Sequence, residues 1–327
     1  MKLLALVLAG GEGNRLYPLT AEHAKPAVRF VDGYRIVDFV LSNLVNSKIS
    51  TIYVLAQYKP ESLCRHIDAV WAPRGTGAGS RIEVLLPRSD DAADRFKGTA
   101  DAVYQNLGLI ARHRPDLVAV FAADHVYRMD VRQMVDAHRE RGACLTVAAV
   151  PVPIERARSF GVMATDVNGR ITQFQEKPER PAPIPTDLTR AYASMGNYLF
   201  DPGVLAGLLD GARKNGGADF GRDILPGLAR CSRVFAYDLT SNKVPGVQPY
   251  EEAGYWRDVG TIDALKAAQD DVSGFEPRFN LWNPRWPIHG ERFFEIDAPL
   301  RRPSGSANQS APARPSITDI TLTSRPR

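Results

Sequence analysis

A glycine-rich segment near the start of the chain has the composition of a phosphate-binding loop. It follows an apolar run and reads LAGGEGNRL over residues 8–16. Glycines directly after a buried strand let backbone N–H groups approach a phosphate without interference from Cβ atoms. Arg15 adds a planar guanidinium that pairs well with phosphate oxygens. The candidate ligands of an anionic substrate in this loop are Gly10, Gly11, Gly13 and Arg15.

Two familiar phosphate-binding motifs do not fit this loop. A P-loop needs Gly-Lys-Ser/Thr after the glycines, and the dinucleotide fingerprint needs a third glycine where Leu16 stands. It also needs an acid at the end of the second strand, where Gln57 stands. Taken alone, the loop could equally be a strand-to-helix turn. Lys25 is a second cation near the loop, although a lone lysine is usually solvated.

Two aspartates next to apolar segments are candidate ligands of a divalent cation. Asp124 follows the run Val118–Ala122, at the position where open α/β sheets bind ligands. Asp258 lies among apolar residues in the segment Tyr255–Gly260. Mg²⁺ is typically held by one or two carboxylates together with substrate phosphates and water, so two separate aspartates could complete a site. Each acid could instead cap a helix or pair with a neighbour such as Arg257.

A Glu-Lys-Pro segment, residues 176–178, ends a strand-like stretch. The strand would hold Glu176 and Lys177 at the edge of a sheet. Lys177 could then bind an anionic group, and Glu176 could accept hydrogen bonds. The simpler interpretation is an exposed strand end.

The first 150 residues alternate short apolar runs with stretches of helical period. The runs are Leu3–Leu8, Thr51–Ala56, Leu117–Ala122 and Leu145–Val150. The helical stretches are Arg35–Val45, Thr99–Arg112 and Val131–Glu140. Unbroken apolar strands between helices are typical of a mostly parallel sheet covered on both faces. This pattern predicts a doubly wound α/β fold.

Residues 151–289 are expected to extend the same sheet. Val162–Thr165 and Arg170–Gln175 flank Asn168-Gly169, which favours a hairpin turn. Further strands are predicted at Ala191–Phe200 and Val234–Leu239. Helices are predicted at Asp219–Leu228, capped by Asp219, and at Ile262–Val272.

The composition is that of an ordinary globular protein. The chain has 327 residues, of which 44% are hydrophobic and 24% charged, enough for a large core. The net charge of +4 gives no argument for a nucleic-acid partner, although it suits acidic small substrates. Cys64, Cys144 and Cys231 are widely spaced, which favours free thiols in a reducing cytoplasm over disulfides or a zinc site.

Neither a secretory signal nor a membrane span is expected. The segment Leu3–Ala9 imitates the start of a signal, but it is short and leads directly into the glycine loop. No apolar run reaches the length of a membrane span. From about residue 290 the pattern ends, and Pro303–Arg327 is rich in Ser, Pro and Arg. We therefore predict a folded domain over residues 1–289 and a disordered tail over residues 290–327.

The order and spacing of several segments resemble the glucose-1-phosphate adenylyltransferases (ADP-glucose pyrophosphorylases) of bacterial type. The segments are LAGGEGNRLYPLT, AKPAV, RIVDFVLSN, GTADAVYQN, DHVY, VPVPIERARSFGVM, FQEKP, ASMGNYLF, DFGRDILP and YWRDVGT. The similarity covers about residues 3–289. The glycine loop and EKP are shared with nucleotidyltransferases in general, whereas GTADAV, ASMG and YWRDVGT point to this branch.

The resemblance implies a Rossmann-like nucleotidyltransferase domain. Its implied reaction joins ATP and glucose 1-phosphate with Mg²⁺, giving ADP-glucose and diphosphate for the synthesis of glycogen or other α-glucans. The implied catalytic residues are Arg15, Lys25 and Asp124, with Asp124 and Asp258 as metal ligands. Glucose 1-phosphate would contact Gly161, Glu176, Lys177, Ser194 and the position of Phe96. The nucleotide side would comprise Gly10, Gly11, Gly13, Arg15, Gln57, Gly98 and Thr99.

The chain departs from the family pattern at three positions near these residues. Residues 95–97 are Arg-Phe-Lys where the family usually has Trp-Tyr-Arg. Phe96 thus lacks a hydroxyl associated with the sugar phosphate, a loss of roughly 0.5–1.5 kcal/mol. Ala123 replaces a usual glycine before Asp124. Glu22 and His23 stand where activator-sensitive members carry Lys and Arg, so repulsion of an anionic activator is expected.

The family continues past the segment PRWPI into a β-helix of hexapeptide repeats that supports tetramers. This chain has the Pro-rich tail at that place, so we do not assume a homo-oligomer or regulation by effectors. Two alternatives stay open. The base or sugar could differ (UTP, dTTP, GTP or mannose 1-phosphate), or the chain could be a catalytically silent regulatory subunit or a truncated remnant.

Overall fold

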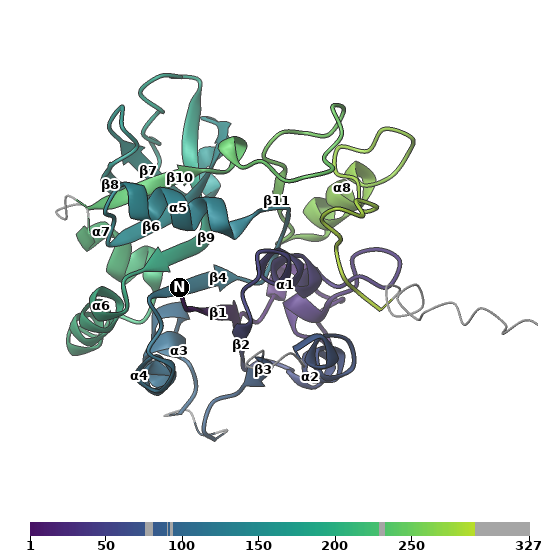
Figure 1. Cartoon of the computed structure of the whole chain (residues 1–327), viewed down its shortest axis with the longest axis horizontal. Coiled ribbons are helices and arrows are strands. Elements are labelled where there is room, and N and C mark those ends of the chain that lie inside the picture. Colours follow the sequence, from purple (N-terminus) through teal and green to yellow (C-terminus); the bar gives the residue numbers. More distant parts are fainter. Residues whose placement is uncertain (76–80, 90, 92–93, 229–232, 292–327) are drawn as a thin grey trace, which may run out of the picture.

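A nine-stranded sheet forms the centre of the structure (Figure 1). The computed structural model describes residues 1–75, 81–89, 91, 94–228 and 233–291, so nearly all of the predicted tail lies outside the described residues. The strand order is β10-β6-β9-β4-β1-β2-β3, with β7 paired to β8 and β9. The strands are β1 (Leu3–Ala9), β2 (Thr51–Ala56), β3 (Arg81–Leu85), β4 (Leu117–Ala122), β6 (Leu145–Pro153), β7 (Gly161–Thr165), β8 (Ile171–Glu176), β9 (Arg190–Phe200) and β10 (Val234–Asp238).

The predicted mostly parallel sheet is confirmed. β1 runs parallel to β2 on one side and to β4 on the other. β2 and β3 are parallel, as are β10 and β6. The antiparallel pairs all involve β7, β8 or β9: β9 runs antiparallel between β4 and β6, and β7 is antiparallel to both β8 and β9. The segment Leu3–Ala9, which imitates a signal sequence, is an interior strand of this sheet.

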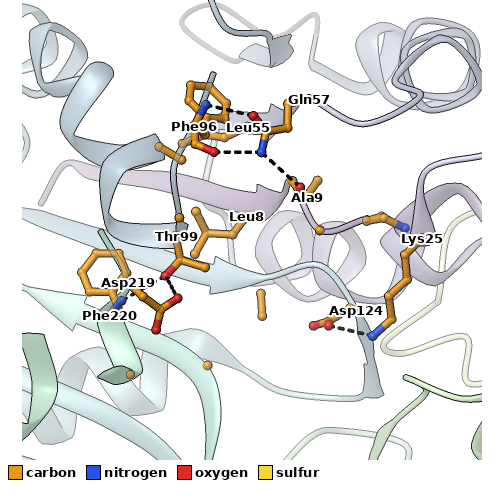
Figure 2. Close-up of a pocket in the computed structure, with 18 of the residues that line it drawn as sticks. Leu8, Ala9, Lys25, Leu55, Gln57, Phe96, Thr99, Asp124, Asp219 and Phe220 are labelled. Carbon is orange, nitrogen blue, oxygen red and sulfur yellow. Dashed lines mark hydrogen bonds and ion pairs between the residues drawn. The ribbon is translucent and has the colours of Figure 1, made fainter. Parts of the chain in front are cut away.

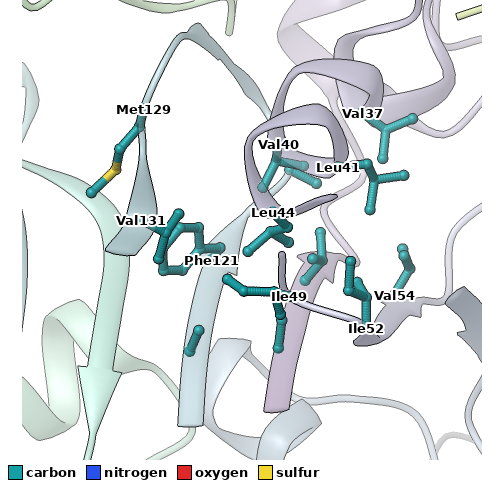
Figure 3. Packing of buried hydrophobic residues seen from close by; sticks show 14 of the residues in the cluster. Val37, Val40, Leu41, Leu44, Ile49, Ile52, Val54, Phe121, Met129 and Val131 are labelled. Carbon is teal, nitrogen blue, oxygen red and sulfur yellow. The ribbon is translucent and has the colours of Figure 1, made fainter. Parts of the chain in front are cut away.

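Helices cover both faces of the sheet. The helices on the sheet are α1 (Ile36–Asn46), α2 (Glu61–His66), α3 (Thr99–Gln105), α4 (Leu107–His113), α5 (Val131–Glu140), α6 (Pro202–Lys214) and α7 (Leu225–Leu228). A further helix, α8 (Ile262–Asp271), packs in a separate buried cluster. Alternate residues of β1 face opposite sides, as strand geometry requires. Ala5 and Val7 belong to a buried cluster with α1 and α5, seen in part in Figure 3. Leu4 and Leu6 belong to a second buried cluster with α3, α4 and α6.

Two predicted helices have a different form. The stretch Thr99–Arg112 is divided into α3 and α4 at Asn106, whose side-chain amide donates to the carbonyl of Ala102 at 2.8 Å. The stretch Asp219–Leu228 begins as a π-helical turn, Phe220–Ile224, and continues as α7. The predicted cap is confirmed, because the Asp219 carboxylate accepts a hydrogen bond from the Arg222 backbone N–H at 3.1 Å.

The hairpin and the later strands follow the prediction. β7 and β8 are antiparallel, and Gly169 adopts the positive φ of 79° that the turn needs. The Asp166 carboxylate supports the turn by accepting from the backbone N–H groups of Asn168 and Arg170. β9 and β10 extend the main sheet as expected.

A second, two-stranded sheet was not predicted from the sequence. β5 (His125–Tyr127) pairs antiparallel with β11 (Trp256–Asp258), and His125 lies opposite Asp258. A third buried cluster, which includes Val126, Tyr255 and Val259, packs this ribbon against Phe39 of α1. The C-terminal part of the described chain is thereby joined to the first α/β units.

Among the described residues, no helix combines the length and the apolar character that a membrane span requires. Cys64 and Cys144 are thiols, in agreement with the sequence prediction. Cys231 lies outside the described residues.

A buried carboxylate joins α1 to α2 and the turn that follows it. Asp38 has no exposed surface. One carboxylate oxygen lies 2.6 Å from His66 Nε2 and 2.7 Å from the indole nitrogen of Trp71. The other accepts a hydrogen bond from the Arg35 backbone N–H at 2.7 Å. The loss of this acceptor would leave buried donors without partners.

Asp38→Ala is therefore expected to lower the free energy of unfolding by about 3–5 kcal/mol. Urea denaturation followed by circular dichroism measures this change. Asp210→Ala on the exposed face of α6 is the control, with an expected change within about 0.5 kcal/mol. Equal effects of the two substitutions would contradict a structural role of the Asp38 carboxylate.

Candidate active site

A cavity of about 650 Å³ opens beyond the carboxyl ends of β1 and β4 (Figure 2). Its lining comes from the glycine loop, the segment before α3, the end of β4, and strands β7, β8 and β9. Open α/β sheets bind their ligands at this edge. The cavity is therefore the main candidate for an active site.

The cavity brings together most of the residues selected from the sequence. Those that line it are Gly10, Gly11, Lys25, Gln57, Phe96, Gly98, Thr99, Asp124, Gly161, Glu176 and Ser194. Four selected residues are not part of the lining: Gly13, Arg15, Lys177 and Asp258.

On the glycine-loop side, the side-chain amide of Gln57 connects two segments of the lining. Its oxygen accepts a hydrogen bond from the Phe96 N–H at 2.9 Å, and its nitrogen donates to the Phe96 carbonyl at 3.0 Å. The same nitrogen lies 3.5 Å from the Gly10 carbonyl. Phe96, which is almost fully buried, thus lies beside the loop that follows β1.

Gly13 shapes the loop from outside the cavity. Its φ is 69°, a conformation that favours glycine. A Cβ atom here would lie 3.0 Å from the Cβ of Lys25 and 3.0 Å from a methyl group of Thr20. Gly13 therefore lets the segment that carries Lys25 pack directly against the glycine loop.

The start of α3 is joined to the π-helical turn Phe220–Ile224. The Thr99 hydroxyl donates to the Asp219 carboxylate at 2.8 Å and accepts from the Phe220 N–H at 3.0 Å. At Gly98, a Cβ atom would lie only 2.5 Å from the Ala218 carbonyl oxygen. These contacts place Asp219 in the cavity wall.

A cluster of acids and one imidazole lies at the end of β4. Single ligand atoms of Asp124, His125 and Asp258 lie within 4.8 Å of one another. Lys25 Nζ is 2.8 Å from an Asp124 oxygen and 3.6 Å from an Asp258 oxygen. His125 Nε2 is 3.4 Å from the other Asp124 oxygen. Two carboxylates and an imidazole in this arrangement are a suitable donor set for a divalent cation.

The charges around Asp124 keep it ionised. Burial would raise the pKa of its carboxyl, but the charges of His125 and Lys25 outweigh burial and hold that pKa well below its usual range. Glu176, at the far side of the cavity, instead has a raised pKa. Burial is the main cause, and the charge of Asp219 raises this pKa further, whereas the charges of Lys177 and Arg222 lower it.

Two glycines leave space beside Glu176. A Cβ atom on Gly221 would lie 2.9 Å from a Glu176 carboxylate oxygen. A Cβ on Gly161 would lie 3.2 Å from the same oxygen and 2.6 Å from the Phe174 ring. Ser194 lies on β9 nearby in the lining, where its hydroxyl accepts from the Gly196 N–H at 3.2 Å. This end of the cavity offers hydrogen-bond acceptors in a space that glycines keep open.

Two of the predicted phosphate-binding cations extend away from the lining. The Lys177 side chain is 67% exposed, and its ammonium lies 3.8 Å from a Glu176 oxygen. Arg15 is exposed, and its guanidinium lies beside Gly260. A Cβ atom on Gly260 would lie 3.0 Å from the Arg15 guanidinium and 3.0 Å from an Asp258 carboxylate oxygen.

His125, Asp219 and Tyr198 were not selected from the sequence as site residues, yet all three line the cavity. His125 and Asp219 belong to the segments DHVY and DFGRDILP, which already carried the resemblance. Asp219 was predicted only as a helix cap. Burial raises the pKa of Tyr198, so its phenol remains protonated and can serve as a hydrogen-bond donor.

Comparison with known proteins shows the family of the chain. The nucleotidyl transferase family model matches residues 4–274. The chain belongs to the nucleotidyl transferase family. Within it, the chain is a member of the glucose-1-phosphate adenylyltransferase family, as the sequence segments indicated.

Three relatives illustrate this similarity, each named glucose-1-phosphate adenylyltransferase. The protein of Thermodesulfovibrio yellowstonii is 51% identical over 89% of this chain and 71% of its own length. That of Anaeromyxobacter sp. (strain Fw109-5) is 49% identical over 88% of this chain and 70% of its own. That of Thermus thermophilus is 45% identical over 93% of this chain and 75% of its own.

The close approach at Gly98 gives a test of the cavity wall. Gly98→Ala is expected to lower the free energy of unfolding by about 1–3 kcal/mol, because its methyl group would collide with the Ala218 carbonyl. Thermal denaturation checks this.

Gly108→Ala on α4 is the matched control, since nothing lies within 4 Å of the added methyl group. It is expected to be neutral or stabilising by up to about 1 kcal/mol. If Gly98→Ala were as stable as this control, the result would contradict the close approach of Gly98 to the Ala218 carbonyl.

Proposed function

We propose that the protein transfers AMP from ATP to α-D-glucose 1-phosphate, which gives ADP-glucose and diphosphate for the synthesis of glycogen or other α-glucans. The observation that carries the proposal is a single cavity lined both by the glycine loop and by Glu176 and Ser194. Its acid cluster lies at the end of β4. The names of the relatives support the same reaction.

The reaction requires no covalent intermediate on the protein. A phosphate oxygen of glucose 1-phosphate forms a bond to the α-phosphorus of ATP, and the bond from that phosphorus to the oxygen of the diphosphate breaks. The nucleophile is already an anion, so no general base is required. The protein contributes positioning and neutralisation of charge in the transition state.

The acid cluster fits the Mg²⁺ ion that this chemistry uses. Asp124 and Asp258 would hold it through carboxylate oxygens, together with substrate phosphates and water. When bound, Mg²⁺ supplies charge neutralisation on the nucleotide phosphates. The low pKa of Asp124 keeps this ligand deprotonated.

The substrates are assigned to opposite ends of the cavity. The amides of Gly10 and Gly11, together with Arg15 and Lys25, act on the triphosphate of ATP, with Gly13 shaping the loop. The rest of the nucleotide side is formed by Gln57, Gly98 and Thr99. Glucose 1-phosphate is assigned to Gly161, Glu176 and Ser194, with Lys177 turning toward its phosphate.

Residues 1–289 constitute the catalytic domain in this proposal. The cytoplasmic location of the protein stays a prediction.

The first test is diphosphate release by the purified protein with Mg²⁺, ATP and glucose 1-phosphate. Asp124→Asn is expected to lower kcat by about a hundredfold or more, because a ligand of the metal is lost. If well-folded wild-type protein released no diphosphate with these substrates, nor with UTP, dTTP, GTP or mannose 1-phosphate, the enzyme proposal would be overturned. Activity with another nucleotide or sugar phosphate alone would instead correct the specificity.

Phe96→Tyr tests which substrate this position serves. If the added hydroxyl reaches the sugar phosphate, the KM for glucose 1-phosphate should fall roughly two- to tenfold at unchanged kcat. Steady-state kinetics with each substrate varied in turn measures this. A change confined to the KM for ATP would place the position on the nucleotide side, beside Gln57 and the glycine loop.

The raised pKa of Glu176 predicts a pH dependence of sugar-phosphate binding. Only the ionised carboxylate has full acceptor capacity for sugar hydroxyls, and a raised pKa means that protonation begins at a higher pH than usual. Affinity should therefore be complete at neutral pH and decline as the pH falls toward this pKa. The KM for glucose 1-phosphate between about pH 8 and pH 5 should rise more steeply for wild type than for Glu176→Gln, which cannot titrate. Parallel profiles would contradict the assignment.

A further inference from the structure

The ammonium of Lys25 lies between the two carboxylates that are assigned to the metal. Its Nζ atom is 2.8 Å from Asp124 Oδ2 and 3.6 Å from Asp258 Oδ1. The Lys25 side chain is 9% exposed, whereas those of Asp124 and Asp258 are 36% and 27% exposed. The most buried charge of the three is therefore the lysine, and it faces both acids at once.

The backbone fixes the base of this side chain. Lys25 begins a 3-10 turn, Lys25–Ala27, with Pro26 in its first turn and all three residues buried. The close approach to Gly13 described above holds the stem of Lys25 against the glycine loop. Only the distal part of the side chain is free to change direction, from the acids toward the glycine loop.

The same oxygens cannot serve an ammonium and a divalent cation equally well. With the lysine in place, the ammonium already balances one of the two negative charges of the carboxylates. The Arg15 guanidinium beside Asp258 reduces the attraction for a further cation. A divalent ion that enters alone would meet the Lys25 ammonium at close range, where charge repulsion in a partly buried site is strong. When a divalent ion enters together with a nucleotide, the phosphates of that nucleotide supply additional negative charge. They also give the Lys25 ammonium a new partner.

We propose that Lys25 is the resident counter-ion of Asp124 and Asp258 in the nucleotide-free protein and competes there with free divalent metal. When metal and nucleotide bind together, the ammonium passes from the carboxylates to the nucleotide phosphates. This deepens the proposed function, on which it rests, by assigning an order: the metal is bound with the nucleotide and not before it. Mg²⁺ usually occupies protein sites of this kind together with substrate phosphates.

The test measures Mn²⁺ binding to the nucleotide-free protein by the electron paramagnetic resonance signal of free Mn²⁺. Lys25→Met is expected to bind Mn²⁺ at least about tenfold more tightly than wild type, because the competing charge is gone. Lys25→Arg keeps the charge and is expected to resemble wild type. Equal or weaker binding by Lys25→Met, or tight binding by Lys25→Arg, would overturn the proposal.

Lys59→Met is the matched control for the loss of one positive charge. The Lys59 ammonium donates to the carbonyls of Thr20 and Ala21 and not to the acids. It should leave Mn²⁺ binding unchanged, and an increase equal to that of Lys25→Met would refute a specific competition. Binding is read without turnover, so an inactive protein would count against the proposed reaction and not against this inference.

A measurement on the wild-type protein covers the case in which Lys25→Met does not fold. The ¹⁵N resonance of the Lys25 ammonium, identified by its loss in Lys25→Arg, should be unchanged by Mg²⁺ alone. It should shift when Mg²⁺ is added with a non-hydrolysable ATP analogue. A shift with Mg²⁺ alone would show that the metal displaces the lysine without nucleotide, and the inference would fall.

Discussion

The site depends on the pairing of two strands of three residues each. β5 continues directly from the Asp124 turn, and β11 ends in Asp258, so their antiparallel register sets the distance between the two acids. A ribbon this short is not stable by itself. Burial of Val126, Tyr255 and Val259 in the third cluster stabilises it. The metal-binding geometry is therefore a consequence of packing between the C-terminal part of the described chain and α1.

The face of β11 opposite Asp258 is fixed by ionic contacts. Adjacent side chains of a strand point to opposite faces, so Arg257 points away from the acid cluster. Its guanidinium contacts Glu252 at 2.7 Å and Asp271 of α8 at 2.8 Å. Burial acts against the charge, but these acids and Tyr255 raise the pKa of Arg257 above its usual range, so the cation is permanent. From the sequence, Arg257 is a possible partner of Asp258, but in the structure it pairs with Glu252 and Asp271 on the other face.

Elements with a strong local pattern could be predicted from the sequence. β2, β4 and α5 have the predicted bounds, because unbroken apolar runs and a clear helical period depend only on neighbouring residues. β5 and β11 are too short to show a period, and their pairing joins distant parts of the chain. The antiparallel direction of β9 was not predicted for the same reason, since direction depends on the chain path between strands. The break at Asn106 coincides with a side-chain hydrogen bond to the Ala102 carbonyl, which no periodic pattern reports.

Some residues of the site could be selected from a local sequence pattern, whereas others are placed by contacts with distant parts of the chain. Gly10, Gly11 and Asp124 could be selected because they follow apolar runs, and a strand that ends at the sheet edge places the next residues in the cavity. The same argument applies to His125, which directly follows Asp124. Asp219 could not be selected in this way, because its position depends on the contact of Thr99 with the π-helical turn.

The three cations predicted to face phosphates have three different environments. Lys25 is buried between acids, Arg15 is exposed beside Asp258, and Lys177 is exposed beside Glu176. Lys25 and Lys177 are therefore paired with carboxylates in the absence of substrate, and Arg15 lies near one. Long side chains of this kind can exchange a carboxylate for a phosphate by rotation of their distal bonds, without a change in the backbone. The cavity thus avoids an uncompensated concentration of positive charge, and the anionic substrates complete its electrostatics when they bind.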